Sequence, residues 1–418
     1  MTTVIAFILM FGLLVFVHEW GHLIFAKRAG MLAREFAIGF GPKIVSFTKN
    51  ETLYTIRLIP AGGYVRVAGE DPEIIDLKPG HHIGLTFNEA GKVDKIIVNN
   101  KSKHPDAQIV EVEHADLDHR LVVEGYEPGE DDKLFFEVDP KALFVLDEKE
   151  TQIAPYDRQF ASKPKRSRAM QLFAGPMMNF VLAIILFTIL GFIQGVPADE
   201  ARFGEIQEES PATEAGFQPG DEVIQAEGQQ VETWEDFTLI VQNHPEETMS
   251  VTLERNGTTE EVEVTPRAVE AQEQTIGQVG VTRAFEDSFA KKLSFGFTQT
   301  YDWSTLILTN LGKLVTGQFS IDMLSGPVGI YDATDQVVQT GLTNFVMWTA
   351  VLSVNLGIVN LMPIPALDGG RLLFIGVELI RGKPVDPQKE GAITLVGFAL
   401  LLLLMIVVTW NDIQRLFL

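Results

Sequence analysis

The chain has 418 residues, which exceeds one ordinary core of roughly 100–200 residues, so two or more structural units are expected. Its formal net charge of −23 argues against a nucleic-acid partner, because phosphate contacts need a basic surface. Cysteine is absent, which excludes disulfides, a thiol nucleophile and thiolate-bound metal, so any metal must bind to His, Asp or Glu.

Four apolar stretches are long enough to cross about 30 Å of hydrocarbon. They cover residues 4–26, 170–196, 345–362 and 391–410. A mean hydropathy of +0.14 beside 21% charged residues agrees with a membrane protein that also carries polar domains. The first stretch has no basic residue before it and no A-x-A cleavage site, so we expect a retained span rather than a signal peptide. The expected fold class is therefore an α-helical membrane protein with four transmembrane helices.

Basic residues set the expected orientation of these spans. They lie between the first two spans (Lys27, Arg28, Arg34, Lys163, Lys165, Arg166 and Arg168) and between the last two (Arg371, Arg381, Lys383 and Lys389). Because cytoplasmic loops of membrane proteins are rich in Lys and Arg, both loops are expected in the cytoplasm. Both termini and residues 197–344 then face outward, and the lipid bilayer is an expected partner.

The first span contains the pattern H-E-x-x-H, formed by His18, Glu19 and His22. On a helix the two histidines project from one face and can bind one metal ion. Glu19 lies beside them, where it can take a proton from a water molecule. Three ionisable side chains in an apolar span are costly unless they line a polar cavity or bind something. The pattern favours a zinc site; the alternatives are a buried polar cluster that joins helices and a proton relay.

The segment between the first two spans is expected to hold a β-hairpin and then an acidic insert. Residues 54–67 indicate two short strands around a Pro-Ala-Gly-Gly turn at residues 60–63. A free strand edge there could pair with an extended peptide, so Gly62 and Gly63 are candidate substrate-binding residues; alternatively, the hairpin only packs on the helices. Residues 69–162 are rich in Asp and Glu and are expected to form a solvated, partly flexible cytoplasmic insert without an assignable role; the alternative is an accessory cytoplasmic subdomain.

A separate outward-facing domain is expected over residues 199–268. Residues 210–224, SPATEAGFQPGDEVI, resemble the S-P-A-x-x-A-G-[LF]-x-x-G-D-x-I pattern of bacterial PDZ domains. A helix over 234–243 and strands over 249–254 and 260–265, joined by Asn-Gly, complete the β-rich pattern. PDZ grooves bind extended peptide ends, so this domain either holds a trimmed substrate end or excludes bulky substrates, and the sequence does not separate the two.

Residues 284–330 carry apolar side chains at helical spacing and are expected to form amphipathic helices on the outer membrane surface. Asp302 and Lys313 argue against a fifth span there. The complete expected organisation is residues 1–68 with the first helix and hairpin, 69–162 as the insert, 163–198 with the second helix, 199–268 as the PDZ domain, 284–330 as surface helices, and 345–418 with the third and fourth helices.

A catalytic zinc normally has three protein ligands and one open position, so a third ligand should come from another span. Asp368 is the conspicuous candidate, because it follows the third span near its cytoplasmic end. His22 lies about 7.5 Å from the same end of the first span, at the helical rise per residue. The alternative for Asp368 is a helix-end aspartate before two glycines. Pro363 and Pro365 cannot continue a regular helix, so the third span should unwind there and expose backbone groups.

Together these segments resemble the site-2 protease family of intramembrane zinc metalloproteases, in its bacterial, single-PDZ branch. The first span matches the family's zinc motif, and residues 360–369, NLMPIPALDG, match its N-x-x-P-x-P-x-L-D-G motif. Residues 175–179 (GPMMN) and 325–329 (SGPVG) also resemble family segments.

The resemblance implies a zinc metalloendopeptidase of a bacterial plasma membrane, with Zn²⁺ held by His18, His22 and Asp368 near the cytoplasmic leaflet. Glu19 would be the general base. Asn360 would bind unwound substrate backbone, although its alternative is a polar contact between helices. The implied substrates are single-span membrane proteins, such as anti-sigma factors already trimmed by another protease, and remnant signal peptides.

Two other classes of protein are compatible with parts of the pattern. An ordinary zinc protease anchored by a span would carry H-E-x-x-H in a soluble domain, whereas here the motif lies in the span itself. A non-catalytic PDZ scaffold, or an ion transporter that uses the polar span, would cleave no peptide bond. The position of Glu19 and the lack of a second polar span disfavour both.

Overall fold

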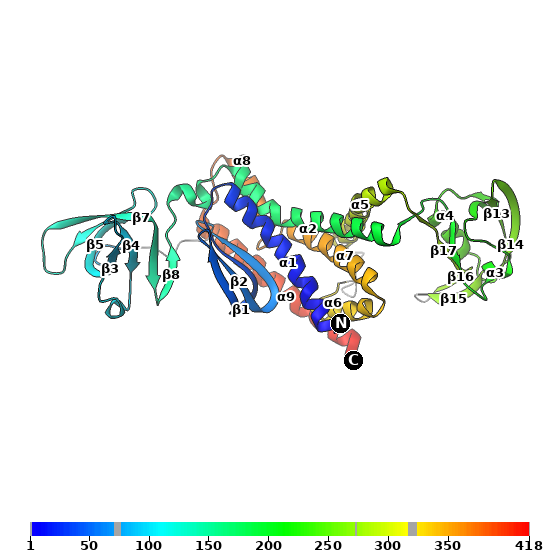
Figure 1. Cartoon of the computed structure of the whole chain (residues 1–418), viewed down its shortest axis with the longest axis horizontal. Coiled ribbons are helices and arrows are strands. Elements are labelled where there is room, and N and C mark those ends of the chain that lie inside the picture. The colour runs from blue at the N-terminus through cyan, green and yellow to red at the C-terminus, as the bar shows by residue number, and fades with distance from the viewer. Residues whose placement is uncertain (1, 71–76, 272–273, 317–323, 418) are drawn as a thin grey trace. The chain divides into compact units, whose positions relative to one another are not determined.

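The computed structural model describes residues 2–70, 77–271, 274–316 and 324–417 (Figure 1). The chain divides into two units, one formed by residues 1–183 and 302–418 and the other by residues 184–301. Helices α2 and α5 each continue from one unit into the other, and the units are described separately below.

Among the described residues, four helices are long and apolar enough to cross a membrane, as the sequence predicts. They are α1 (Thr3–Arg28), α2 (Lys165–Gln194), α7 (Leu342–Leu361) and α9 (Pro387–Phe417). Two shorter helices, α6 (Pro327–Gln339) and α8 (Asp368–Arg381), accompany them in the first unit. Only 11% of an 18-residue apolar stretch of α9 is buried within the protein. Side chains exposed in this way need a non-aqueous surrounding, which a bilayer provides.

Glycine residues bring α1 and α2 into backbone contact. A Cβ atom at Gly21 of α1 would lie 2.3 Å from the carbonyl oxygen of Ala174 in α2. Small residues at a helix crossing let the two backbones approach closely, which is how membrane helices associate without a hydrophobic driving force. This crossing fixes the face of α2 that looks onto His18 and His22.

A long β-hairpin follows α1, formed by β1 (Ala33–Lys49) and β2 (Thr52–Val67). The chain reverses direction around residues 60–63, where the sequence predicts a turn, although these residues are assigned to β2. The reversal between β1 and β2 lies at Asn50 and Glu51. Both of these residues have positive φ, 50° and 62°, which is the backbone of a two-residue hairpin turn. Ile38 lies between Ile56 and Gly63, because residues 53–56 run parallel to residues 35–38 on one side and residues 63–67 run antiparallel to residues 33–38 on the other. The two strands predicted around the turn therefore flank the start of β1 and do not pair with each other.

The described part of the acidic segment folds as a β-sheet, and the expected flexibility of part of it stays a prediction. Its strands are β3 (His82–Phe87), β4 (Val93–Ile97), β5 (Gln108–Asp116), β6 (Val122–Tyr126), β7 (Lys133–Leu146) and β8 (Lys149–Gln152). They are ordered β4-β3-β5-β6-β7-β8, and β4 also pairs with β7, so the sheet closes on itself around a core that includes Ile83, Leu85 and Ile96. The charged residues that suggested flexibility lie on the outside of this sheet, and residues 71–76 of the segment fall outside the described residues.

The second unit contains the β-rich domain that the sequence predicts. A four-stranded sheet has the order β12 (Gln229–Gln230), β11 (Glu222–Ala226), β13 (Met249–Arg255) and β14 (Thr258–Val264). Further pairs join β9 (Val196–Pro197) to β18 (Phe285–Glu286), β10 (Phe203–Ile206) to β17 (Val281–Arg283), and β15 (Arg267–Ala271) to β16 (Gln274–Gln278). The pairing of β10 with β17 carries this fold beyond residue 268, because β17 lies at residues 281–283.

The second unit also contains the short helices α3 and α4. Helix α3 (Pro211–Glu214) begins at Ser210, whose side chain caps it, and α4 (Trp234–Gln242) begins at a capping box of Thr233 and Asp236. The segment expected to form amphipathic helices contains α5 (Phe289–Val315), of 27 residues, and the start of α6 at Pro327. Residues 317–323 of the expected surface segment fall outside the described residues.

Candidate metal centre and active site

His18 and His22 lie one turn apart on α1, and Asp368 is the first residue of α8. The Nε2 atoms of the two histidines are 3.3 Å apart, and they lie 3.2 and 3.4 Å from Oδ2 of Asp368. Two ligands of a tetrahedral zinc at about 2.05 Å would be separated by about 3.3 Å. The three atoms therefore form one face of such a tetrahedron. Two imidazoles and a carboxylate fit the donor set of a catalytic zinc site, and all three residues line a cavity.

The chain brings Asp368 to this point by breaking the third span. Helix α7 ends at Leu361, and α8 starts six residues after Met362. A Cβ atom at Gly369 would lie 2.2 Å from the carbonyl oxygen of Leu361, and one at Gly370 would lie 2.3 Å from that of Ile364. Only glycine allows α8 to pack this closely on the end of α7. The two glycines after the aspartate are thus required by the fold.

Helix α2 forms the wall behind the histidines. A Cβ atom at Gly175 would lie 2.2 Å from Nε2 of His22 and 2.9 Å from Nε2 of His18, so no larger residue fits there. The Nδ1 atom of His22 lies 2.8 Å from the carbonyl oxygen of Gln171, also in α2. This contact places the ring proton on Nδ1 and leaves the Nε2 lone pair free for a metal.

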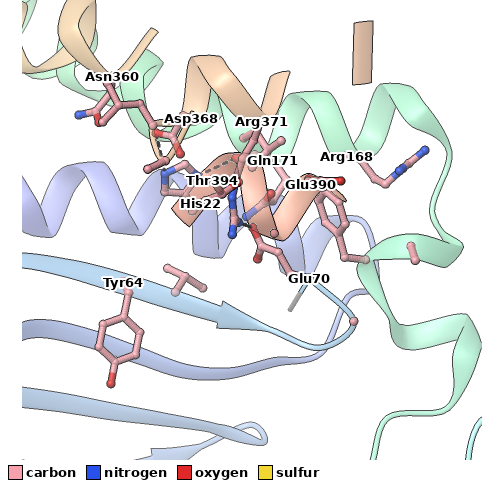
Figure 2. A pocket seen from close by; sticks show the side chains of 18 of the residues that line it. His22, Tyr64, Glu70, Arg168, Gln171, Asn360, Asp368, Arg371, Glu390 and Thr394 are labelled. Carbon is pink, nitrogen blue, oxygen red and sulfur yellow. Dashed lines mark hydrogen bonds and ion pairs between the residues drawn. The ribbon is translucent and has the colours of Figure 1, made fainter. Parts of the chain in front are cut away.

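Glu19 lines the same cavity, which has a volume of about 900 Å³ and lies between α1, α2, β2, α8 and α9 (Figure 2). The side chain of Glu19 is 8% exposed, and the backbone of Gly63 in β2 packs against it. A Cβ atom at Gly63 would lie 2.8 Å from Cγ of Glu19 and 2.7 Å from Cγ1 of Val15. The backbone of the hairpin therefore lies against the side chain of Glu19, the predicted general base.

The remaining predicted site residues divide into two groups. Asn360 lines the cavity and lies near Asp368, and its side chain donates a hydrogen bond to the carbonyl oxygen of Leu356 at 3.0 Å (Figure 2). Gly62, Pro363 and Pro365 are not among the residues that line it. The two prolines lie in the break between α7 and α8, where the sequence predicts an interruption, and Gly62 has a φ of 127° at the bend in β2.

Charged side chains at one end of the cavity were not singled out from the sequence as site residues. Glu70 forms an ion pair with Arg371, and Arg168 donates to both carboxylate oxygens of Glu378 at 2.7 Å. Arg168 and Arg371 contributed only to the topology argument, because their ion-pair partners are far away in the sequence. Their proximity to the histidine motif depends on the packing of α2 and α8, which no local pattern encodes.

Outside this cavity, the pKa of the carboxyl group of Glu51 is strongly lowered. Glu51 at the hairpin turn accepts hydrogen bonds from Arg158 at 3.0 Å and from Gln152 at 2.8 Å. The bond from the Arg158 guanidinium is the larger cause, and together they lower the pKa of Glu51 to about 2. These hydrogen bonds join the hairpin turn to the segment that precedes α2.

The chain is similar to known proteins over nearly its whole length. The chain matches Peptidase family M50 over residues 6–404. It is 67% identical over 424 residues to "Zinc metalloprotease RasP" of Oceanobacillus iheyensis, with all of both chains covered. It is 54% identical over 418 residues to "Regulator of sigma-W protease RasP" of Bacillus subtilis, covering 100% of this chain and 99% of the relative. Among solved structures, the PDZ domain of an SdrC-like protein from Listeria monocytogenes aligns with 21% of this chain and 92% of its own, at 17% identity and a TM-score of 0.19.

Proposed function

The chain belongs to peptidase family M50, and from this we propose that it cleaves the membrane-spanning segment of single-span anti-sigma factors that another protease has already shortened. It is a zinc metalloendopeptidase that acts by intramembrane cleavage in regulated proteolysis, and it is a multi-pass membrane protein. The observation that carries the proposal is the convergence of two imidazoles and a carboxylate beside Glu19, inside a cavity bounded by apolar spans.

In this proposal His18, His22 and Asp368 hold the zinc ion. Zinc, when bound, polarises the scissile carbonyl and makes water acidic enough to be deprotonated near neutral pH. Glu19 accepts a proton from the attacking water and then delivers it to the leaving amine, a transfer that its position beside the histidine pair allows. Glu19 is buried, and the backbone of Gly63 packs against its side chain, which limits the positions that the carboxylate can take.

Cleavage requires that the substrate helix unwind, because hydrogen bonds within a helix shield its peptide groups. We assign Asn360 and the β2 edge at Gly62 and Gly63 to hold the unwound segment, Asn360 by a side-chain hydrogen bond and the strand by edge pairing. Two observations support this assignment: Asn360 and Gly63 both line the cavity, and so do Ala366 and Leu367, which lie in the break between α7 and α8.

The proposed setting is a bacterial plasma membrane, with the centre toward the cytoplasmic leaflet and the second unit outside. The basic residues around residues 27–34 and 163–168 support this orientation. The name of the Bacillus subtilis relative, regulator of sigma-W, supports an anti-sigma factor as substrate. Remnant signal peptides, which are also single apolar helices, are a second substrate class with the same chemistry. We assign residues 199–283 as a PDZ domain that holds the trimmed substrate end or excludes untrimmed substrates.

The test uses the purified chain in liposomes with a single-span anti-sigma factor, offered both full-length and shortened on its outer side. The proposal expects cleavage of the shortened form within its span and little cleavage of the full-length form. Deletion of residues 199–283 should then raise cleavage of the full-length form if the domain excludes it, or lower cleavage of the shortened form if the domain holds its end. Equal cleavage of both forms by the intact chain would overturn the requirement for trimming.

The ligand assignment has its own test, which needs no substrate. Asp368→Ala and His22→Ala should lower bound zinc, whereas His114→Ala, which removes an exposed histidine of β5, should not. Full zinc occupancy in Asp368→Ala would remove this residue from the ligand set.

A further inference from the structure

The side chain of Asn179 in α2 lies against His18, on the side away from Asp368. Asn179 is completely buried, and its side-chain amide nitrogen lies 3.1 Å from Nδ1 of His18. Its amide oxygen is also buried and has no hydrogen-bond partner among the described residues. Ser353 of α7 donates a hydrogen bond to the backbone carbonyl of Asn179 at 2.8 Å, which holds this part of α2 in place.

The orientation of this amide follows from what His18 must do. The Nε2 atom of His18 faces Oδ2 of Asp368 and Nε2 of His22, so it must carry a lone pair to bind a metal. The ring proton then lies on Nδ1, and a buried N–H needs an acceptor. Asparagine oxygen and nitrogen have nearly the same shape, and their assignment rests on the hydrogen-bond network. The amide oxygen of Asn179 is an acceptor of the required kind within reach.

We propose that Asn179 is a positioning residue of the metal centre, whose amide oxygen accepts the Nδ1 proton of His18 and keeps Nε2 free for zinc. The carbonyl oxygen of Gln171 does the same for His22 at 2.8 Å. Gln171, Gly175 and Asn179 are four residues apart in turn, so they share one face of α2. That face supplies one acceptor to each imidazole, with a glycine between them that leaves space for both rings.

This inference rests on the proposed role of His18 as a ligand, and its test uses zinc binding alone, so it can fail while cleavage and the ligand set stand. Zinc affinity would be measured by competition with a chelator for the wild type and for Asn179→Leu, Asn179→Asp and Ser353→Ala. Loss of an outer hydrogen bond to a metal-binding histidine lowers metal affinity by about 10–100-fold. We expect a loss of that size in Asn179→Leu and a loss below about threefold in Asn179→Asp, whose carboxylate is also an acceptor.

Ser353→Ala is the matched control, because it removes a buried hydrogen bond to the same residue without touching an imidazole. It should bind zinc like the wild type. The absorption spectrum of Co²⁺ in the site gives a second readout, which should change in Asn179→Leu and be retained in Asn179→Asp. Wild-type affinity in Asn179→Leu would overturn the proposal. So would equal losses in the Leu and Asp variants, or a loss in Ser353→Ala as large as in Asn179→Leu, since either result would indicate packing alone.

Discussion

Replacement of Gly175 by alanine should damage the metal centre while leaving α2 intact. The added Cβ would lie 2.2 Å from Nε2 of His22, whereas ordinary contact begins at 3.4 Å, so about 1.2 Å must be gained. Retreat of helix α2 would open its close crossing with α1 at Gly21 and break the hydrogen bond from His22 to the Gln171 carbonyl, so it would also disturb the centre. Whether the helix or the imidazole shifts, the displacement is several times the roughly 0.2 Å that metal–ligand distances tolerate.

We expect Gly175→Ala to lower zinc affinity by at least the 10–100-fold that follows loss of an outer contact, and to lower cleavage in parallel. The helix itself gains about 1 kcal/mol of intrinsic propensity from the same change, so unfolding of α2 is not the cause. Gly12→Ala in α1 is the matched control, since no atom lies within 4 Å of its added Cβ. Zinc would be titrated against a chelator for both variants. Wild-type zinc affinity in Gly175→Ala would refute the reasoning.

Three further outcomes follow from the structure. Gly63→Ala should lower turnover more than zinc content, because the added Cβ would lie 2.8 Å from Cγ of Glu19. A shift of about 1 Å at the reacting groups lowers the rate by about 100-fold. An equal loss of zinc would contradict this prediction. Asp412→Ala should lower the free energy of unfolding, measured with denaturant, by about 1–3 kcal/mol. The reason is that this fully buried carboxylate accepts a hydrogen bond from a backbone N–H in the first turn of α6 at 2.8 Å. An unchanged free energy of unfolding would exclude that role. Glu51→Gln should be less stable than the wild type above pH 4.5, because the pKa of Glu51 is lowered in the folded state. The difference in the free energy of unfolding between the two proteins should shrink as the pH falls toward 2. A difference that does not depend on pH would be contrary to this account.

The components of the candidate site could be predicted because their signals are local. H-E-x-x-H places two imidazoles on one helix face by helical periodicity alone, and the prolines at 363 and 365 indicate the break that precedes Asp368. The structure brings these residues together with ligand-atom distances of 3.2–3.4 Å. The role of each residue in catalysis stays a prediction until the variants are measured.

The parts that could not be predicted depend on contacts between distant segments. The turn at Asn50 and Glu51 lacks the Asn-Gly signal of a tight hairpin, and the glycines at 39 and 41 obscure the strand before it. The acidic insert closes by pairing β4 with β7, a non-local arrangement that composition does not reveal. Likewise, Gly63 and Gly175 are required by their neighbours in space, and neither neighbour is close in sequence.

The most direct test of the account compares purified wild type with Glu19→Gln in detergent, against a single-span model substrate, with bound zinc determined for both. The amide keeps the size of the carboxyl group but cannot accept the proton from water. The account predicts equal zinc in the two proteins and cleavage by the wild type alone. Normal cleavage by Glu19→Gln with full zinc would contradict the assignment of Glu19 as the general base, and absence of bound metal in both proteins would contradict the metal centre itself.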